Sequence, residues 1–226
     1  MQLFYTSNPN ATILEDDEFF HCTKVLRNRE NDNIFLTDGR GNLFESKILK
    51  IKKNHCEIKK LKKIKTIKKN NTNHVVCSII KSQNRLEWMI EKLTEIGIDE
   101  ITFISTKYSE RSNINYKRID KKIISALKQC KSLFKPKVNE LISLNEFLKN
   151  EYKKSNKYVA DISSKIEMKK NNNNENSLIL VGPEGDFSKE ELEILNKKGY
   201  QGISLGNQVL RSETAALISG YLLVSK

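Results

Sequence analysis

Two glycine turns near the end of the chain hold the residues best suited to bind a ligand. The first is GPEG (182–185), which follows an apolar run, and the second runs from Gly206 to LRSET (210–214). Glycine lets the backbone approach a ligand closely, and proline stiffens a turn. One such turn is an ordinary connection between a strand and a helix. Two that also carry these charged residues favour a binding site lined by backbone donors and acceptors.

Other kinds of site find little support in the sequence. There is no phosphate-binding lysine motif, and the GxG at 39–41 lies in a hairpin turn, so a dinucleotide site is not indicated. No Ser/His/Asp order suggests a hydrolase, because all three histidines precede residue 75. The four cysteines are scattered and have no histidine pair at ligand spacing. We therefore expect reduced thiols and no bound metal.

Alternating strands and helices must position the two turns. After NNTN (70–73), apolar runs predict strands over 74–81, 99–106, 157–162, 178–181 and 202–205. Helical patterns cover 84–97, 116–133, 189–198 and 212–225, with a short one at 144–150. Gly97 is a natural helix stop, and Ser188 with Glu191 forms a capping box. This order predicts an α/β domain with a mostly parallel sheet, at whose carboxyl edge ligands bind.

The first seventy residues predict a small, barrel-like β domain. We expect a strand at 3–7, a helix at 16–27, a hairpin at 33–51 around DGRG (38–41), and one or two lysine-bearing edge strands at 55–67. The composition changes at NNTN (70–73). The predicted domains are therefore residues 1–72 and residues 73–226.

The chain is strongly basic, with a formal net charge of +12 that is unevenly spread. Residues 47–69 hold eleven lysines and one acid, and residues 107–137 hold ten basic residues and two acids. Such concentrations favour a polyanionic partner, most simply a nucleic acid. The alternative is a Lys- and Asn-rich composition imposed by biased codon usage. No apolar run is long enough to span a membrane, and the N-terminus lacks the features of a secretory signal, so we expect a cytoplasmic protein.

These turns resemble a known family. LVGPEG (180–185) and LGNQVLRSET (205–214) resemble the paired cofactor loops of the SPOUT methyltransferases, and most of all the RsmE family, which methylates N3 of a uridine in 16S ribosomal RNA. Other similar stretches are HCTKVLR (21–27) with TDG (37–39), KSQNRLEWMIEKLTEIG (81–97), SERS (109–112), and Gln129 with Pro136. The resemblance covers nearly the whole chain, in order.

The resemblance implies a fold, a cofactor and partners. The first domain would be a PUA-like β-barrel that helps to bind RNA, and the second a SPOUT domain with a deep trefoil knot. The cofactor would be S-adenosyl-L-methionine, held by the two glycine turns. The enzyme would be a homodimer that acts on 16S rRNA in the small ribosomal subunit.

Site residues follow from the same resemblance. Cofactor contacts would come from the two glycine turns: Leu180, Gly182, Pro183, Gly185, Leu205, Gly206 and Leu210. Because N3 of uridine must lose a proton before methylation, Arg211 is the candidate for stabilising the resulting anion, and Glu184 and Glu213 are candidate bases. Each could instead be structural, in an ion pair or beside a helix start. Arg27 and Arg111 are candidates for RNA contact.

Two departures and two alternatives remain. The stretch KSLFK (131–135) lacks the small and basic pattern expected after Gln129 for RNA contact. Asp186 stands where the family often has glycine, and its carboxylate would be tolerated if it faced solvent or capped the next helix. A non-catalytic RNA-binding assembly factor could keep this fold, and a SPOUT methyltransferase could act on another RNA, such as transfer RNA.

Overall fold

The structure is a computed structural model that describes residues 2–8, 10–109, 113–168 and 175–225. The chain divides into two compact units. The first comprises Met1–Lys68 and Ile124–Lys135, and the second comprises Lys69–Ile123 and Pro136–Lys226. Within the part of the chain that the structure describes, none of the helices combines the length and apolar character that crossing a bilayer requires.

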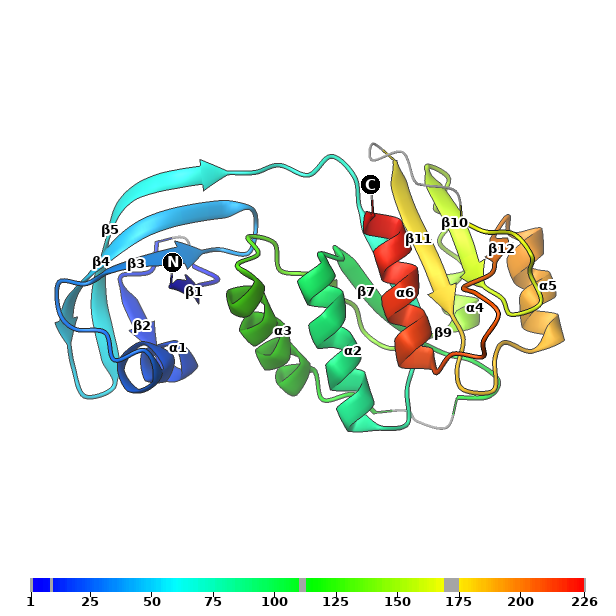
Figure 1. Ribbon diagram of the computed structural model, residues 1–226, viewed down its shortest axis with the longest axis horizontal. Coiled ribbons are helices and arrows are strands. Elements are labelled where there is room, and N and C mark those ends of the chain that lie inside the picture. The colour runs from blue at the N-terminus through cyan, green and yellow to red at the C-terminus, as the bar shows by residue number, and fades with distance from the viewer. Residues whose placement is uncertain (1, 9, 110–112, 169–174, 226) are drawn as a thin grey trace. The chain divides into compact units, whose positions relative to one another are not determined.

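The first unit is built on a five-stranded sheet with the order β1-β3-β4-β5-β2 (Figure 1). Its elements are β1 (Leu3–Tyr5), β2 (Ile13–Glu15), α1 (Asp16–Phe20), β3 (Asn33–Thr37), β4 (Asn42–Ile51) and β5 (His55–Thr66). The predicted hairpin around DGRG is confirmed, because β3 and β4 pair antiparallel on either side of it. The predicted helix at 16–27 is confirmed in place, but it continues from α1 as a π-helix over His21–Val25.

The lysine-rich strand β5 is longer and less peripheral than the sequence suggests. It is a single strand of 12 residues, and it pairs with β4 along its length and with β2 through His55–Glu57. The prediction of an edge strand is therefore wrong for its first residues, which lie between two neighbours. Beyond Ile58 only β4 accompanies it, and most of the lysines there are exposed to solvent.

The second unit is built on a seven-stranded sheet in which every pairing is parallel. The strand order is β12-β10-β11-β6-β7-β8, and β9 also pairs with β7. Its strands are β6 (Asn73–Ser78), β7 (Glu100–Ser105), β8 (Lys137–Val138), β9 (Ile142–Ser143), β10 (Ser155–Ala160), β11 (Asn176–Val181) and β12 (Gln201–Ile203). The predicted parallel sheet is confirmed. The two-residue strands β8 and β9 were not predicted, because they are too short to show a periodic pattern.

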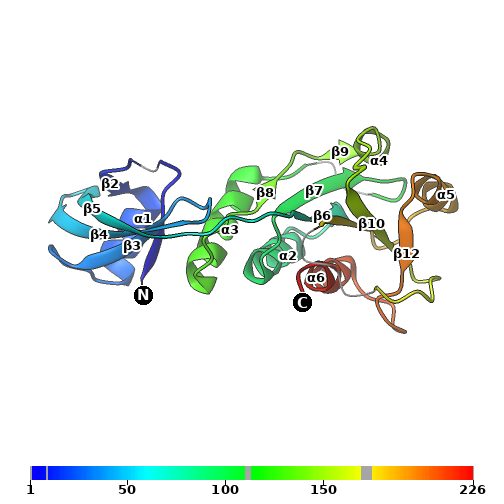
Figure 2. The same ribbon diagram turned by 90° about the horizontal axis from the view of Figure 1, so that it is seen from above.

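Helices cover both faces of this sheet, as predicted. They are α2 (Gln83–Ile96), α3 (Tyr116–Cys130), α4 (Leu144–Phe147), α5 (Lys189–Lys197) and α6 (Ser212–Val224). Figure 2 shows α2 and α6 on one side of the sheet and α4 on the other. One buried cluster joins α2, the first half of α3 and α6 to the sheet, and a second joins α4 and α5 to the opposite face. This double cover explains the mostly apolar central residues of β6, β7 and β11.

The local helix signals act as the sequence predicts. Gly97 ends α2 in the left-handed conformation, with φ of 90°. Ser188 and Glu191 form the full capping box at the start of α5. The capping box fixes where α5 begins, and so it fixes the length of the loop that follows β11 at the carboxyl edge of the sheet. Gly97 fixes where α2 ends, at the opposite edge, before β7.

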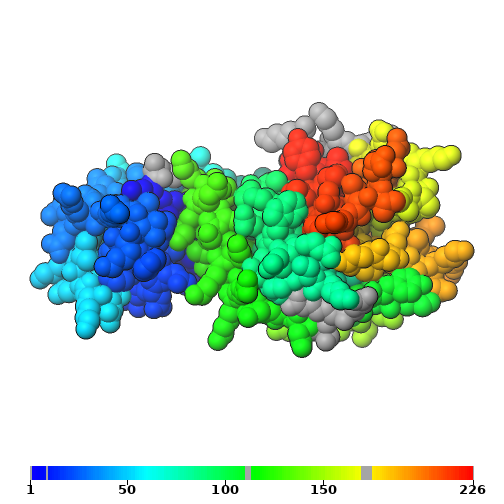
Figure 3. Space-filling view, turned by 60° about the horizontal axis from the view of Figure 1, so that its bottom comes forward, coloured from blue at the N-terminus to red at the C-terminus, as the bar shows by residue number. Residues whose placement is uncertain are grey.

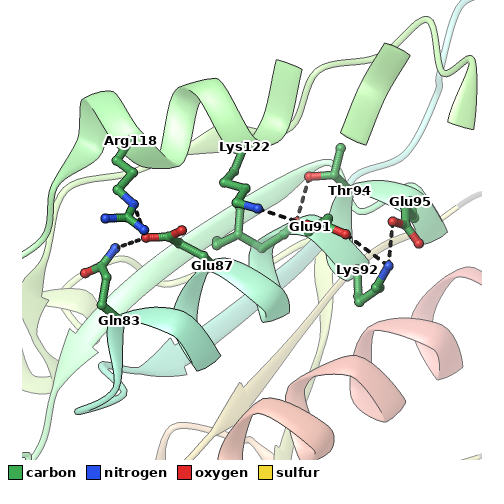
Figure 4. Close-up of polar contacts among 9 residues, drawn as sticks. Gln83, Glu87, Glu91, Lys92, Thr94, Glu95, Arg118 and Lys122 are labelled. Carbon is green, nitrogen blue, oxygen red and sulfur yellow. Dashed lines mark hydrogen bonds and ion pairs between the residues drawn. The ribbon is translucent and has the colours of Figure 1, made fainter. Parts of the chain in front are cut away.

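A polar network joins α2 to α3 (Figure 4). Glu87 is buried on α2, and its carboxylate accepts from Arg118 Nε at 2.5 Å and from Gln83 Nε2 at 2.7 Å. One turn further, Glu91 pairs with Lys122 Nζ at 3.4 Å. Burial opposes ionisation of Glu87, but Gln83 and Arg118 lower the pKa of its carboxyl group. Lys92, and after it Lys122, lower the pKa of Glu91. Two basic side chains of the 107–137 region are thus engaged in ion pairs with α2.

Candidate active site

A pocket lies at the carboxyl ends of β10, β11 and β12, between the two glycine turns. Its walls come from the end of β10, from residues 181–184 with Asp186, from the 205–210 loop, and from the first turn of α6. The strand order makes β10 the neighbour of both β11 and β12, so the segments that follow these strands leave the sheet side by side. The two turns predicted from the sequence therefore meet in space, as carboxyl-end loops of parallel strands do.

Most of the predicted cofactor residues line this pocket. Gly182, Pro183, Leu205, Gly206 and Leu210 all do so. Gly206 has φ of +119°, a conformation that favours glycine, and nothing would meet a Cβ there within 4 Å. Space beside the Gly206 backbone is what close approach of a ligand needs.

Two predicted residues lie elsewhere. Leu180 is fully buried in the cluster against α5, and its neighbour Val181 lines the pocket instead. Successive strand residues point to opposite faces, so only one of this pair can reach the pocket. Gly185 lines an adjoining hollow, together with Ile79, Lys81, Arg85, Lys107, Tyr108, Ser109 and Glu184. Glu184 lines both the pocket and this hollow.

Arg85 connects the first glycine turn to the start of α6. Its Nη2 lies 3.1 Å from Glu184 Oε1, and its Nη1 lies 3.3 Å from Glu213 Oε2. Figure 3 shows the corresponding surface, where the teal start of α2, the gold 182–188 segment and the red start of α6 gather on one face. The side chain of Glu213 is 8% exposed and that of Glu184 is 43% exposed. Arg85 was not predicted as a site residue, because no local pattern links it to carboxylates 99 and 128 positions away.

The three predicted arginines lie in different surroundings. Arg211 is exposed at the N-terminal boundary of α6, and no hydrogen bond or ion pair joins its side chain to any other described residue. The alternative partners considered for it, Glu184 and Glu213, are bound to Arg85 instead. Arg27 is exposed in the first unit, with φ of 54°. Arg111 lies outside the described residues.

The described residues that line the pocket include carboxylates but no basic side chain. Asp161, Glu184 and Asp186 supply the charges, and Gln208 and Ser212 supply neutral polar groups. Half-burial raises the pKa of Asp186, and the nearby negative charge of Asp161 raises it further. The helix start after the turn is capped by Ser188 rather than by Asp186. These carboxylates repel phosphates and suit a ligand that carries positive charge.

A cationic nucleoside fits this pocket better than a nucleotide does. The backbone of two glycine turns, a mixed apolar wall and uncompensated carboxylates match an adenosine joined to a sulfonium amino acid. No group of three or more metal-ligating side chains occurs in the described parts of the chain.

Comparison with known proteins supplies the family. The family model described as an RNA methyltransferase domain matches residues 68–223, and the one described as an RNA methyltransferase PUA domain matches residues 14–61. The chain belongs to this RNA methyltransferase family. A relative from Rickettsia conorii, named ribosomal RNA small subunit methyltransferase E, is 32% identical over 93% of this chain and 87% of its own length. The relative of the same name from Buchnera aphidicola (Acyrthosiphon pisum) is 27% identical over 92% of this chain and 85% of its own.

A solved structure agrees over nearly the full length. The ribosomal RNA small subunit methyltransferase E from Neisseria gonorrhoeae, solved with S-adenosyl methionine bound, matches with a TM-score of 0.85 at 25% identity. The match covers 97% of this chain and 95% of that one. The predicted resemblance and the α/β architecture with a PUA-like unit are therefore confirmed.

The two basic regions of this RNA methyltransferase differ in what their side chains contact. In the 107–137 region, five basic side chains are paired with acids: Lys107, Arg118, Lys122, Lys128 and Lys137. In the 47–69 region, five of the eleven lysines lie on β5 beyond Ile58, and three of the eleven are paired with acids: Lys52, Lys62 and Lys69. Lys59, Lys62, Lys63 and Lys65 are exposed, so β5 gives the first unit a basic surface.

Proposed function

We propose that the protein is an S-adenosyl-L-methionine-dependent methyltransferase that modifies N3 of a uridine in 16S rRNA of the small ribosomal subunit. The observation that carries this proposal is the pair of glycine turns, which form one cation-suited pocket beside a hollow lined by three basic side chains and Tyr108. Glu184 lies at the border of the two. A methyl donor in the pocket and a uracil ring in the hollow would then meet across that border.

Residues of both turns would hold the cofactor, which supplies a methyl group bonded to positively charged sulfur. Gly182, Pro183, Leu205, Gly206 and Leu210 would contact it through backbone and shape. Gly185 would face the acceptor side, and Leu180 would act only through packing. Because the leaving sulfur departs neutral, alignment of the reacting atoms contributes more than acid catalysis at the leaving group.

The three charged residues predicted for catalysis would have different roles. Arg211 is exposed and unengaged by the described residues, so it is available to stabilise negative charge on the flanking carbonyl oxygens of the deprotonated base. Glu184 is the better candidate for the general base that removes the N3 proton, because it lines both the pocket and the hollow and is partly exposed. Glu213 lines neither and would position Arg85.

We further propose that residues 1–72 form the RNA-binding domain and residues 73–226 the methyltransferase domain. The exposed lysines of β5 would contact the rRNA backbone, with Arg27, and Arg111 in the second domain, as further contacts. The trefoil knot, the homodimer and a cytoplasmic location stay predictions. The homodimer is supported by α6, an apolar helix whose Tyr221 is 60% exposed.

Two experiments test the proposal. Nucleosides of small-subunit RNA are compared between cells with and without the gene, and loss of 3-methyluridine is expected on deletion. With purified protein, Arg211→Ala should reduce methylation of small subunits far more than it reduces cofactor binding. Retained 3-methyluridine after deletion would refute the substrate, and near-normal turnover by a folded Arg211→Ala variant would refute the role of Arg211. If calorimetry shows no cofactor binding, the non-catalytic assembly factor becomes the better reading.

A further inference from the structure

Asp186 occupies a backbone position that favours glycine. Its φ is 62°, in the left-handed region that Asp and Asn tolerate better than other side chains do. Its N–H donates to the Pro183 carbonyl at 2.9 Å, and its Oδ1 accepts from the Phe187 N–H at 2.7 Å. The turn therefore holds this carboxylate in one orientation at the wall of the cofactor pocket.

Asp161 is a second fixed carboxylate in the same pocket. It follows β10, and its Oδ1 accepts from the N–H of Ser163 at 2.8 Å and from the hydroxyl at 2.7 Å. Asp161 and Asp186 are close enough to repel each other, which contributes to the raised pKa of Asp186.

No described cation compensates this pair. Among the residues that the structure describes, neither Asp161 nor Asp186 forms an ion pair with a lysine, arginine or histidine. Glu184 lines the same pocket, but Arg85 balances its charge at 3.1 Å. The uncompensated charge is thus confined to the two aspartates, and a half-buried negative pair of this kind is stabilised only when a positive ligand arrives.

We propose that Asp186, together with Asp161, recognises the positive sulfur of the methyl donor and so distinguishes the donor from its neutral product. The inference rests on the proposed cofactor and adds a specificity-determining residue to its site. In the reaction the methyl carbon bonds to N3 of uridine, whose proton has left, and the carbon–sulfur electron pair stays on sulfur. The sulfur thereby loses its charge, and with it the attraction to Asp186. Product release is favoured for this reason.

The test measures binding by calorimetry with the full chain and three ligands. They are S-adenosylmethionine, S-adenosylhomocysteine, which lacks the sulfur charge, and sinefungin, which carries an amine near that position. Asp186→Asn keeps the shape and tolerates the left-handed backbone. The substitution should weaken binding of S-adenosylmethionine and of sinefungin roughly three- to tenfold. This is the effect of one charge pair at about 6 Å in partly hydrated surroundings. Binding of S-adenosylhomocysteine should change by less than about twofold.

Two further variants complete the test. Glu193→Gln is the matched control, because it removes one exposed carboxylate of α5 outside the pocket and should leave all three affinities unchanged. Asp161→Asn should shift the donor-to-product ratio in the same direction as Asp186→Asn does.

The possible outcomes separate this inference from the proposed function. A donor-to-product affinity ratio that stays constant in Asp186→Asn overturns the inference. If that ratio stays constant because binding of donor and product weakens equally, Asp186 lies against the amino group that both share. If the wild-type protein binds none of the three ligands, the proposed function itself fails. Thermal melting of each variant verifies that it is folded.

Discussion

Removing Arg85 should destabilise the second unit by leaving a buried carboxylate unpaired. The guanidinium bridges Glu184 and Glu213, at 3.1 Å and 3.3 Å, and only Glu213 is strongly buried, with 8% of its side chain exposed. Breaking a fully buried ion pair costs about 3–5 kcal/mol, whereas an exposed pair contributes about 0–1 kcal/mol. Arg85 is itself 31% exposed, so water can partly replace it. We therefore expect Arg85→Ala to lower the free energy of unfolding by about 2 kcal/mol, discounting the buried-pair value for this exposure.

Urea unfolding and thermal melting measure the effect. A loss of about 2 kcal/mol corresponds to a fall in Tm of roughly 4–8 °C for a protein of this size. Glu184→Gln is the matched control, because it removes the exposed half of the bridge and should cost less than about 1 kcal/mol.

The double variant makes the reasoning refutable. In Arg85→Ala/Glu213→Gln the unpaired charge is absent, so about 1–2 kcal/mol of the loss should be recovered. If Arg85→Ala is as stable as the wild type, or if the double variant is no more stable than Arg85→Ala, burial of the Glu213 charge is not what Arg85 compensates.

Three further predictions concern stability. Burial lowers the pKa of His74 to about 4, so the unfolded state takes up a proton first as pH falls below 6.5. Unfolding in urea should therefore show a loss of up to about 3 kcal/mol between pH 6.5 and 4 that His74→Gln lacks; parallel profiles would contradict this. Gly41 and Gly97 have nearly equal φ, +91° and +90°, but a Cβ at Gly41 would clash with the Ile67 carbonyl oxygen, whereas nothing lies within 4 Å of one at Gly97. Gly97→Ala should lower the free energy of unfolding by about 1 kcal/mol, and Gly41→Ala should lower it clearly more. Equal melting temperatures of the two variants would refute the difference. Ser188→Ala should cost about 1 kcal/mol by urea unfolding and speed amide exchange at the start of α5, since it removes the cap; unchanged exchange would count against it.

Local patterns in the sequence were sufficient for the helices and the longer strands of the second unit, but not for the two-residue strands β8 and β9. Apolar spacing predicted α2 and its buried face, Gly97 predicted its end, and the capping box predicted the start of α5. These signals depend on residues within one or two turns of each other, so the chain carries them whatever the tertiary structure is. The two glycine turns were found in the same way.

Long-range pairing decided what those turns form. The strand order brings β10 beside both β11 and β12, and α2 contributes Arg85 to carboxylates 99 and 128 positions away. Residues 124–135 join the first unit, where Leu127 and Leu133 pack with Leu3 and Leu43. No periodic pattern encodes such contacts, since the partners share no local neighbourhood.

The sequence by itself determined the elements, the two turns and the family resemblance. Tertiary structure decided which residue of each pair faces the site. Leu180 and Val181 are both buried, because helices cover both faces of the parallel sheet, so hydrophobicity alone could not tell which one reaches the pocket. The same holds for charge: the sequence counts the basic residues of 107–137, but only the fold shows that several of them are paired with acids.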